Sequence, residues 1–200
     1  MSTRPAARTV GVAIAIPEPF GGWLQARRAS FGDAHAGSIP THITLLPPTE
    51  LSTDASHDTG AHLSLVEHQS VVEHLSVVAS STAPFEIHLR GTATFRPVSP
   101  VVFVQLVEGI VGCELLERQV RRGPLQRELH FPYHPHVTVA HDLPDKQLDE
   151  AFKALAGFDC RFEVREFHLY EHGHDGVWRP ERAYQLSASA AVGVPASVSQ

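Results

Sequence analysis

The order of hydrophobic and polar positions along the chain predicts alternating strands and helices between two low-complexity ends. Apolar runs and period-two alternation predict strands at 10–16, 41–48, 84–95, 101–107, 134–141, 162–170 and 177–186. Apolar residues at helical spacing predict helices over 18–31, 61–80, 110–122 and 145–156, the third ended by Gly123 and Pro124. Two consecutive prolines, Pro47 and Pro48, are expected to end the second strand because they remove amide donors.

The elements repeat in order, which indicates the fold class. Each half of the chain reads strand, helix, strand, helix, strand, and the repeat is one of pattern rather than of residues. We therefore expect an α+β protein with a bilobal duplicated fold, in which two antiparallel sheets face a central cleft with helices on the outside. The single bilobal domain is predicted over 9–187, with lobes of about 9–98 and 99–187 that exchange a strand or remain separate. Residues 1–8 and 188–200 are predicted to be disordered tails.

Composition and charge narrow the class of partner. The chain has 200 residues, 42% of them hydrophobic, which suffices for a real core in one domain. The net charge of −6 and the absence of long Lys or Arg runs argue against tight binding of long nucleic acid, although a small or short anionic substrate stays open. The longest apolar runs have strand length, so we expect a cytoplasmic monomer with no membrane partner. Cys113 and Cys160 form no CxxC pair and are expected to be reduced, buried thiols.

Candidate chemistry starts from a short pattern, histidine followed by any residue, a hydroxyl residue and a hydrophobic residue. Chance predicts about 0.8 such matches for this composition. The chain contains more: HITL at 42, HLSL at 62, HQSV at 68, HLSV at 74 and HVTV at 136. The bare pattern is therefore weak, and only its structural context can separate the matches.

Secondary structure separates the five matches. In a strand, residues i and i+2 point to one side, so His42 with Thr44, and His136 with Thr138, each form a polar pair above one face. In a helix, i and i+2 lie about 200° apart, so the histidines in the predicted helix 61–80 cannot act as pairs with their serines. We expect those helical histidines, His62, His68 and His74, to be solvated.

The two strand motifs resemble a known family. HITL at 42 and HVTV at 136, within IPTHITLLPPTEL and FPYHPHVTVAHDLPD, are similar to the paired signature of the 2H phosphoesterase superfamily, in its 2'-5' RNA ligase and cyclic nucleotide phosphodiesterase branch. The resemblance spans about residues 10–186. It implies a cleft between two lobes, no metal, no nucleotide cofactor, His42 and His136 as the catalytic pair, and Thr44 and Thr138 as phosphate ligands. It also implies hydrolysis of 2',3'-cyclic phosphate or 2'-5' phosphodiester bonds in nucleotides or RNA ends, with RNA ligation as the reverse reaction. No further basic residue of the pocket can be placed from the sequence.

Two imidazoles suit this chemistry. Cleaving a phosphodiester needs one proton removed from the attacking oxygen and one delivered to the leaving oxygen, and histidine, with an ordinary pKa near 6.5, does either at neutral pH. Threonine hydroxyls two residues away can donate to the non-bridging oxygens. The sequence does not assign acid and base to the two histidines.

Four further residues are weaker candidates for substrate binding. Tyr133 precedes the second motif and is a candidate to stack on a base, as is Trp178, while Arg179 is a candidate to neutralise phosphate. Arg96 is a similar candidate with less support. For each of these residues, packing or solvation is the alternative.

Two rival functions remain open. His130, His134, His136 and His141, with Asp142, are candidate zinc ligands for a metal-dependent hydrolase, although His42 would then be unexplained. A non-catalytic module that binds nucleotides or RNA ends is the other rival, because a fold does not guarantee its activity.

Overall fold

The computed structural model describes residues 8–51, 60–129 and 131–188, and of 60–67 only the backbone. The strands in these residues are β1 (Thr9–Ala15), β2 (His42–Glu50), β3 (Phe85–Thr94), β4 (Val101–Glu108), β5 (His136–His141), β6 (Asp159–Val164), β7 (Glu166–His172) and β8 (Trp178–Gln185). The helices are α1 (Phe20–Ser30), α2 (Gly60–Ser81), α3 (Ile110–Val120) and α4 (Asp145–Ala154), with two short 3₁₀ helices, η1 (Ala34–Gly37) and η2 (Gly123–Leu125). The predicted alternation of strands and helices is confirmed, and no helix among the described residues is long and apolar enough to cross a membrane.

The strands of the described residues form one sheet rather than the two that were expected. Its order is β6-β3-β4-β5-β2-β1-β7-β8, with antiparallel pairing throughout. The expectation of two sheets is wrong because β2 and β5 are joined, through the pair Ile43 and Val137. The α+β class is confirmed, whereas the duplication into two lobes stays a prediction.

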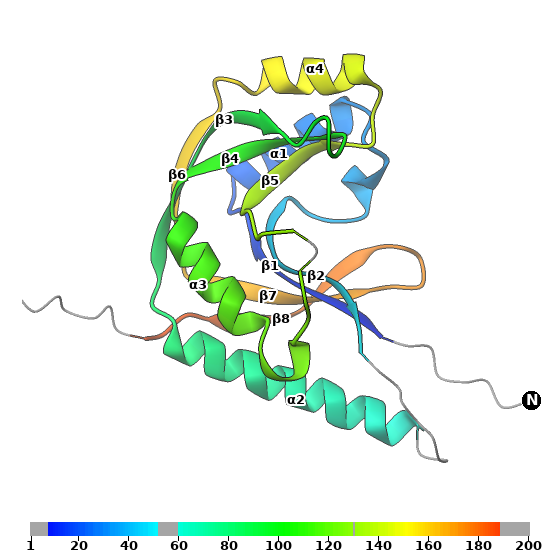
Figure 1. Cartoon of the computed structure of the whole chain (residues 1–200), viewed down its shortest axis with the longest axis vertical. Coiled ribbons are helices and arrows are strands. Elements are labelled where there is room, and N and C mark those ends of the chain that lie inside the picture. The colour runs from blue at the N-terminus through cyan, green and yellow to red at the C-terminus, as the bar shows by residue number, and fades with distance from the viewer. Residues whose placement is uncertain (1–7, 52–59, 130, 189–200) are drawn as a thin grey trace, which may run out of the picture.

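The sheet curls, and a short link explains why. The predicted strand 162–170 is two strands, β6 and β7, separated only by Arg165. β6 lies at one end of the sheet and β7 lies next to β8 at the other end. Because one residue joins them, the two ends of the sheet must come close together, as Figure 1 shows.

The prolines do not end β2, which was expected to stop before them. Leu46 pairs with Val12 of β1 and Thr49 pairs with Val10, so β2 contributes one more residue than β1 between these pairs. Pro47 and Pro48 therefore lie in a bulge, where the ladder requires no amide donor from them. The strand continues to Glu50, so the prolines interrupt its pairing with β1 locally and do not terminate it.

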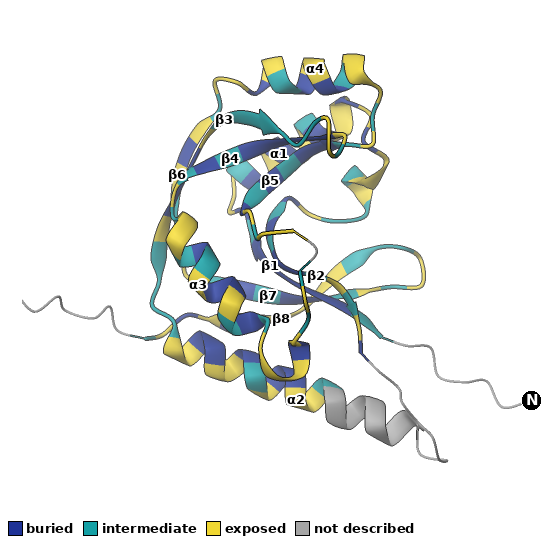
Figure 2. Ribbon diagram, viewed as in Figure 1, coloured by how far each residue is buried: buried dark blue, intermediate teal, exposed yellow. Residues whose placement is uncertain are grey.

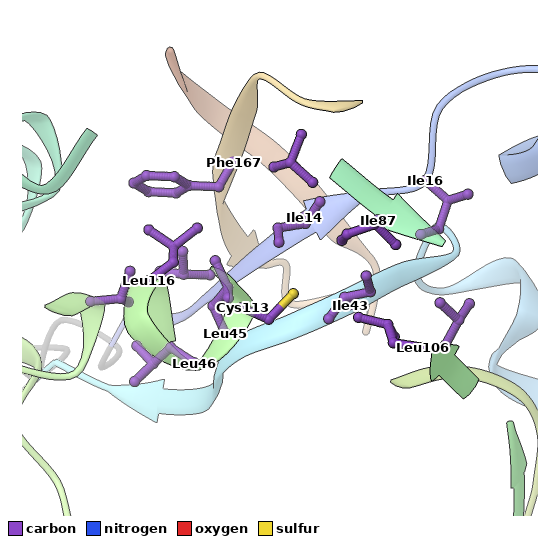
Figure 3. Close-up of a cluster of buried hydrophobic side chains, with 14 of the residues drawn as sticks. Ile14, Ile16, Ile43, Leu45, Leu46, Ile87, Leu106, Cys113, Leu116 and Phe167 are labelled. Carbon is purple, nitrogen blue, oxygen red and sulfur yellow. The ribbon is translucent and has the colours of Figure 1, made fainter. Parts of the chain in front are cut away.

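The core lies on one face of the curled sheet and is closed by helices. Figure 3 shows Cys113 and Leu116 of α3 beside Ile43 and Leu45 of β2, with Ile14 of β1 close by. These side chains are at most 1% exposed, and burying an aliphatic side chain of this size is worth about 1.5–3 kcal/mol. α2 packs against α3 and β8, α4 against β3, β4 and β5, and α1 against β5. Figure 2 shows the burial concentrated along the strands and on the helix sides that face them.

The expectations for the two cysteines, the helical histidines and the two tails have different outcomes. Cys113 and Cys160 are free and buried, as expected. The helical histidines that the structure describes are not fully solvated: His68 contacts Glu181, and the Nε2 of His74 lies 3.1 Å from the Val120 carbonyl oxygen. The side chain of His62 lies outside the described residues. So do the predicted tails, 1–8 and 188–200, except for Arg8, which pairs with Glu171, and Ala188.

Candidate active site

The pairing of β2 with β5 brings the two His-x-Thr motifs together. Ile43 is opposite Val137 in an antiparallel register, so Thr138 lies across from His42 and His136 lies across from Thr44. Ile43 and Val137 point into the core, and the four polar side chains point to the opposite face of the sheet. Diagonal neighbours of this kind are roughly 7–8 Å apart, a separation that leaves room for a phosphate between two imidazoles.

One hydrogen bond fixes the orientation and tautomer of His42. Its Nδ1 lies 2.7 Å from the Pro40 carbonyl oxygen, and a carbonyl only accepts, so Nδ1 carries the proton and donates it. In the neutral ring Nε2 is then an acceptor, and it lies 3.2 Å from the Thr44 hydroxyl, which can donate to it. The His42 ring therefore presents a basic nitrogen on the side of Thr44.

His136 is held by the same kind of contact. Its Nδ1 donates to the His134 carbonyl oxygen at 2.7 Å, so its Nε2 is also left for other partners. The ring is packed against two phenylalanines, with centroid distances of 4.9 Å to Phe95 and 5.0 Å to Phe103. In both motifs the carbonyl two residues before the histidine sets the tautomer.

Burial makes both histidines harder to protonate. Loss of solvent lowers the pKa of His42 to about 4, the hydrogen bond to Pro40 opposes this, and the charges of Arg28 and His136 lower it further. Loss of solvent also lowers the pKa of His136, against the effect of the His134 carbonyl, and the His134 ring adds to the lowering. His42 is therefore neutral at pH 7 in the free protein.

A network from α1 holds the turn that carries Pro40. Gln25 of α1 donates through Nε2 to the Ile39 carbonyl at 3.2 Å and to the Ala36 carbonyl, and its Oε1 accepts from the Thr41 hydroxyl at 2.6 Å. Next to it, the buried pair of Arg28 and Asp33 closes at 2.8 Å, and Asp33 accepts the backbone N–H of His35 at the start of η1. These contacts fix the Pro40 carbonyl, and through it His42.

A small pocket opens beside His42 and Thr44. Its volume is about 80 Å³, and its lining is mainly apolar: Gly11, Val12, Ala13, Ile39, Leu46, Pro47, Pro48, Tyr170 and Trp178 complete it. The Trp178 backbone N–H donates to the Ser38 carbonyl at 2.8 Å, which joins the β8 end to the turn before β2. Trp178, a candidate from the sequence, is thus in the pocket, and no Lys or Arg occurs among the described residues that line it.

The pocket also contains residues that the sequence analysis did not select. Gly11 is paired with Tyr170, and a Cβ on Gly11 would lie 3.2 Å from the Trp178 ring. A glycine in the interior of a strand marks a close approach, so Gly11 gave a usable signal. Tyr170 could have been found from its alternation with His168 on one strand face.

The remaining candidates lie elsewhere. Tyr133 packs against the core and donates its hydroxyl to the Thr44 carbonyl at 3.0 Å, so its polar end is already used to hold β2. Arg179 is exposed and binds Asp175 through two nitrogens, at 2.9 and 2.6 Å. Arg96 binds Asp145 and Asp149 of α4.

The candidate zinc ligands do not converge in the described residues. The His134 and His136 rings are adjacent, with centroids 6.1 Å apart, but His141 is at the other end of β5 and pairs with Asp142 at 3.3 Å. His141 lies five positions after His136 along the strand, roughly 16 Å away. No group of three or more His, Cys, Asp or Glu side chains in the described part of the chain is arranged to hold a metal ion, and His130 lies outside that part.

Comparison with known proteins identifies the family of the chain. Residues 16–176 match the family model described as the "2'-5' RNA ligase superfamily". A "Putative phosphoesterase" of Geobacillus kaustophilus is 26% identical over 170 residues, covering 84% of this chain and 90% of that protein. One from Bacillus mycoides is 26% identical over 156 residues, covering 77% and 83%.

Solved structures share the fold. The crystal structure of E. coli LigT complexed with 3'-AMP superposes with a TM-score of 0.62 at 17% identity, covering 92% of this chain and all of that chain. A second, titled only as a phosphoesterase, gives a TM-score of 0.61 at the same identity and coverage. Fold and family together define a phosphoesterase of the 2H type. The chain belongs to the 2'-5' RNA ligase superfamily.

Proposed function

We propose that this protein is a metal-independent phosphodiesterase that opens 2',3'-cyclic phosphates or cleaves 2'-5' phosphodiester bonds of nucleotides or RNA ends. The observation that carries the proposal is the matched pair of histidines: each donates Nδ1–H to the carbonyl two residues before it, and the β2–β5 register sets both on one face. Each is followed by a threonine on the same face, so two bases and two hydroxyls surround one site.

His42 acts as the general base of hydrolysis. Its pKa of about 4 keeps Nε2 unprotonated at pH 7, so it can accept the proton of the attacking water. The water oxygen bonds to phosphorus as the bond to one ribose oxygen breaks, and His136 delivers a proton to that oxygen. General acid–base help of this kind is worth about 10²- to 10⁴-fold per group.

His136 acts as the acid because a bound phosphodiester brings a negative charge that the free site lacks. A negative charge next to an imidazole favours its protonated form and raises its pKa. Thr44 and Thr138 donate to the non-bridging oxygens, where charge develops in the transition state. For Thr44 this requires the hydroxyl to turn from His42 Nε2, 3.2 Å away, to the phosphate. In ligation of a cyclic phosphate end, a hydroxyl takes the place of the attacking water, so His42 accepts its proton and His136 again protonates the ribose oxygen that leaves.

The apolar pocket takes the base or sugar of the nucleotide. Trp178 offers a ring face for stacking, worth about 1–3 kcal/mol per base where it occurs. The LigT structures complexed with 3'-AMP, NADP+ and ATP support a small nucleotide as ligand of this fold. The geometry favours other roles for two candidates: Tyr133 positions β2, and Arg179 stabilises the β7–β8 turn through Asp175.

The test is turnover of 2',3'-cyclic nucleotides and a 2'-5'-linked dinucleotide in EDTA. His42→Ala and His136→Ala should each lose activity by at least about 10²-fold. His141→Ala, at the opposite end of β5 from His136, is the matched control and should retain activity. Loss of wild-type activity in EDTA with recovery on adding Zn²⁺ would favour the zinc hydrolase. Nucleotide binding without any turnover would favour the binding module.

A further inference from the structure

Four arginines line a groove outside the candidate active site. Arg118, Arg121, Arg122 and Arg127, with Gln126, Glu128 and Leu129, surround a space of about 880 Å³ at the end of α3 and after η2. The whole chain has a net charge of −6, whereas four of the seven lining residues are cationic and one is anionic. The groove is therefore a local reversal of the charge of the protein.

Two of the arginines build the groove. The Nη1 of Arg121 donates to the Arg127 carbonyl at 3.0 Å, and its Nε pairs with Glu117. The Nη1 of Arg127 donates to the Pro48 carbonyl at 3.1 Å and to the Thr49 hydroxyl at 2.9 Å. The segment after η2 is thereby tied both to α3 and to the end of β2.

The other two arginines face solvent. Arg118 and Arg122 are exposed, and neither guanidinium has a hydrogen bond or ion pair to the part of the chain that the structure describes. A guanidinium offers a planar fork of donors that fits a phosphate in a bidentate manner. The groove thus combines a fixed wall with two cations available for an anion.

The groove is connected to the candidate active site through the bulge of β2. Pro47 and Pro48 line the pocket beside His42, and the Pro48 carbonyl accepts the hydrogen bond from Arg127. α3 covers the Ile43 face of the sheet and His42 lies on the other face, so a ligand that reaches both must pass around the end of β2. Figure 1 shows the segment between η2 and β5 running beside β2 at this place.

We propose that this groove binds backbone phosphates of a single-stranded RNA whose end lies at His42 and His136, beside the apolar pocket. The inference rests on the proposed function and deepens it, because it makes an RNA end, rather than a mononucleotide alone, the preferred substrate. An open, cationic groove fits a chain of phosphates that are separated from one another, and a strand leaving over Pro47 and Pro48 meets Arg127 first, because Arg127 binds the Pro48 carbonyl. Binding is expected for short strands, since the rest of the surface carries excess negative charge.

The experiment compares a decanucleotide RNA ending in a 2',3'-cyclic phosphate with the matching cyclic mononucleotide. Binding of the fluorescent decanucleotide is measured on a background carrying His42→Ala, so that no turnover occurs, at several salt concentrations. Arg118→Gln with Arg122→Gln should weaken that binding about tenfold and lower the log–log salt slope by about 1.4, or 0.7 for each lost phosphate contact. Activity is measured in the same double arginine variant with His42 intact. The ratio of kcat/KM for the decanucleotide to kcat/KM for the mononucleotide should be about tenfold lower than in wild type. Arg90→Gln, an exposed arginine on β3 outside the groove, is the control and should change neither quantity.

The outcomes separate the two proposals. Arginine-dependent RNA binding without turnover of either substrate keeps the groove and refutes the proposed function. Turnover of both substrates with RNA binding that is the same in wild type and the double variant refutes the groove. Equal arginine-dependent binding of inorganic phosphate and of the decanucleotide would assign the groove to a free anion. Arginine-dependent binding of polyglutamate without RNA binding would assign it to an acidic protein, and either result overturns the inference.

Discussion

Ile43 of β2 lies opposite Val137 of β5, and this pair joins the two strands that carry the candidate catalytic histidines. Both side chains are fully buried in the core, one residue away from His42 and His136 in the sequence. The packing of the core on one face of the sheet therefore sets the separation of the two imidazoles on the other face.

This relationship predicts a coupled loss of stability and activity. Ile43→Ala should lower the free energy of unfolding by about 2–5 kcal/mol, and Ile43→Val by about 0.5–1.5 kcal/mol. Because the cavity lets β2 shift against β5, kcat per folded molecule should also fall, which urea unfolding and assays well below the melting temperature measure. Leu89→Ala on β3, equally buried, is the control that should lose stability while keeping kcat. An Ile43→Ala protein with full kcat would show that this contact does not set the spacing.

The pKa of His42 predicts a dependence of stability on pH. In the folded protein its pKa is about 4, and in the unfolded chain it returns to about 6.5. Between these values the unfolded chain binds a proton that the folded protein does not. The free energy of unfolding that unprotonated His42 contributes is thus complete above pH 6.5. It is lost as the pH falls to 4, at about 1.4 kcal/mol per pH unit over this window.

Denaturant unfolding between pH 4 and 7.5 measures this slope. His42→Gln should flatten it, although the lowered pKa of His136 leaves a smaller slope of the same sign. His141→Gln is the comparison variant and should unfold with the wild-type pH dependence. A His42→Gln protein with an unchanged slope would contradict the burial of an unprotonated His42.

The sequence located the histidines because strand alternation and the pairing of two similar motifs are local signals. Whether β2 and β5 share one sheet depends on contacts between residues 94 positions apart, such as Ile43 and Val137, which periodicity does not report. The prediction that the two prolines end the strand is wrong for a related reason. A bulge needs knowledge of the partner strand, here Val10 and Val12 of β1. The pattern predicts a single strand over 162–170 because Arg165 interrupts it for a single residue, without a glycine or proline to mark the break.

Tyr133 should act on β2 rather than on substrate. Its hydroxyl donates to the Thr44 carbonyl at 3.0 Å, so Tyr133→Phe leaves that carbonyl without this donor. We expect a loss of about 0.5–1.5 kcal/mol in stability and a lower kcat, with KM for a cyclic nucleotide nearly unchanged. Thermal unfolding and steady-state kinetics measure the two effects. If the ring stacked on the base, KM would rise instead, and Tyr133→Leu would raise it much more than Tyr133→Phe.

Gly11 should determine how large a base the pocket accepts. A Cβ at this position would lie 3.2 Å from the Trp178 ring and 3.4 Å from the Leu46 carbonyl oxygen, so a side chain there must push Trp178 away or fill its space. Gly11→Val should therefore raise KM for a purine cyclic nucleotide about tenfold, and raise it less for a pyrimidine, whose ring is smaller. Since the atoms nearest a Cβ at Gly11 belong to Trp178 and Leu46 rather than to either histidine, kcat and the pH profile should stay close to wild type. Gly157→Ala, where a Cβ meets open space, is the matched glycine control. Equal KM values for purine and pyrimidine substrates in Gly11→Val would show that the base does not occupy the space beside Trp178.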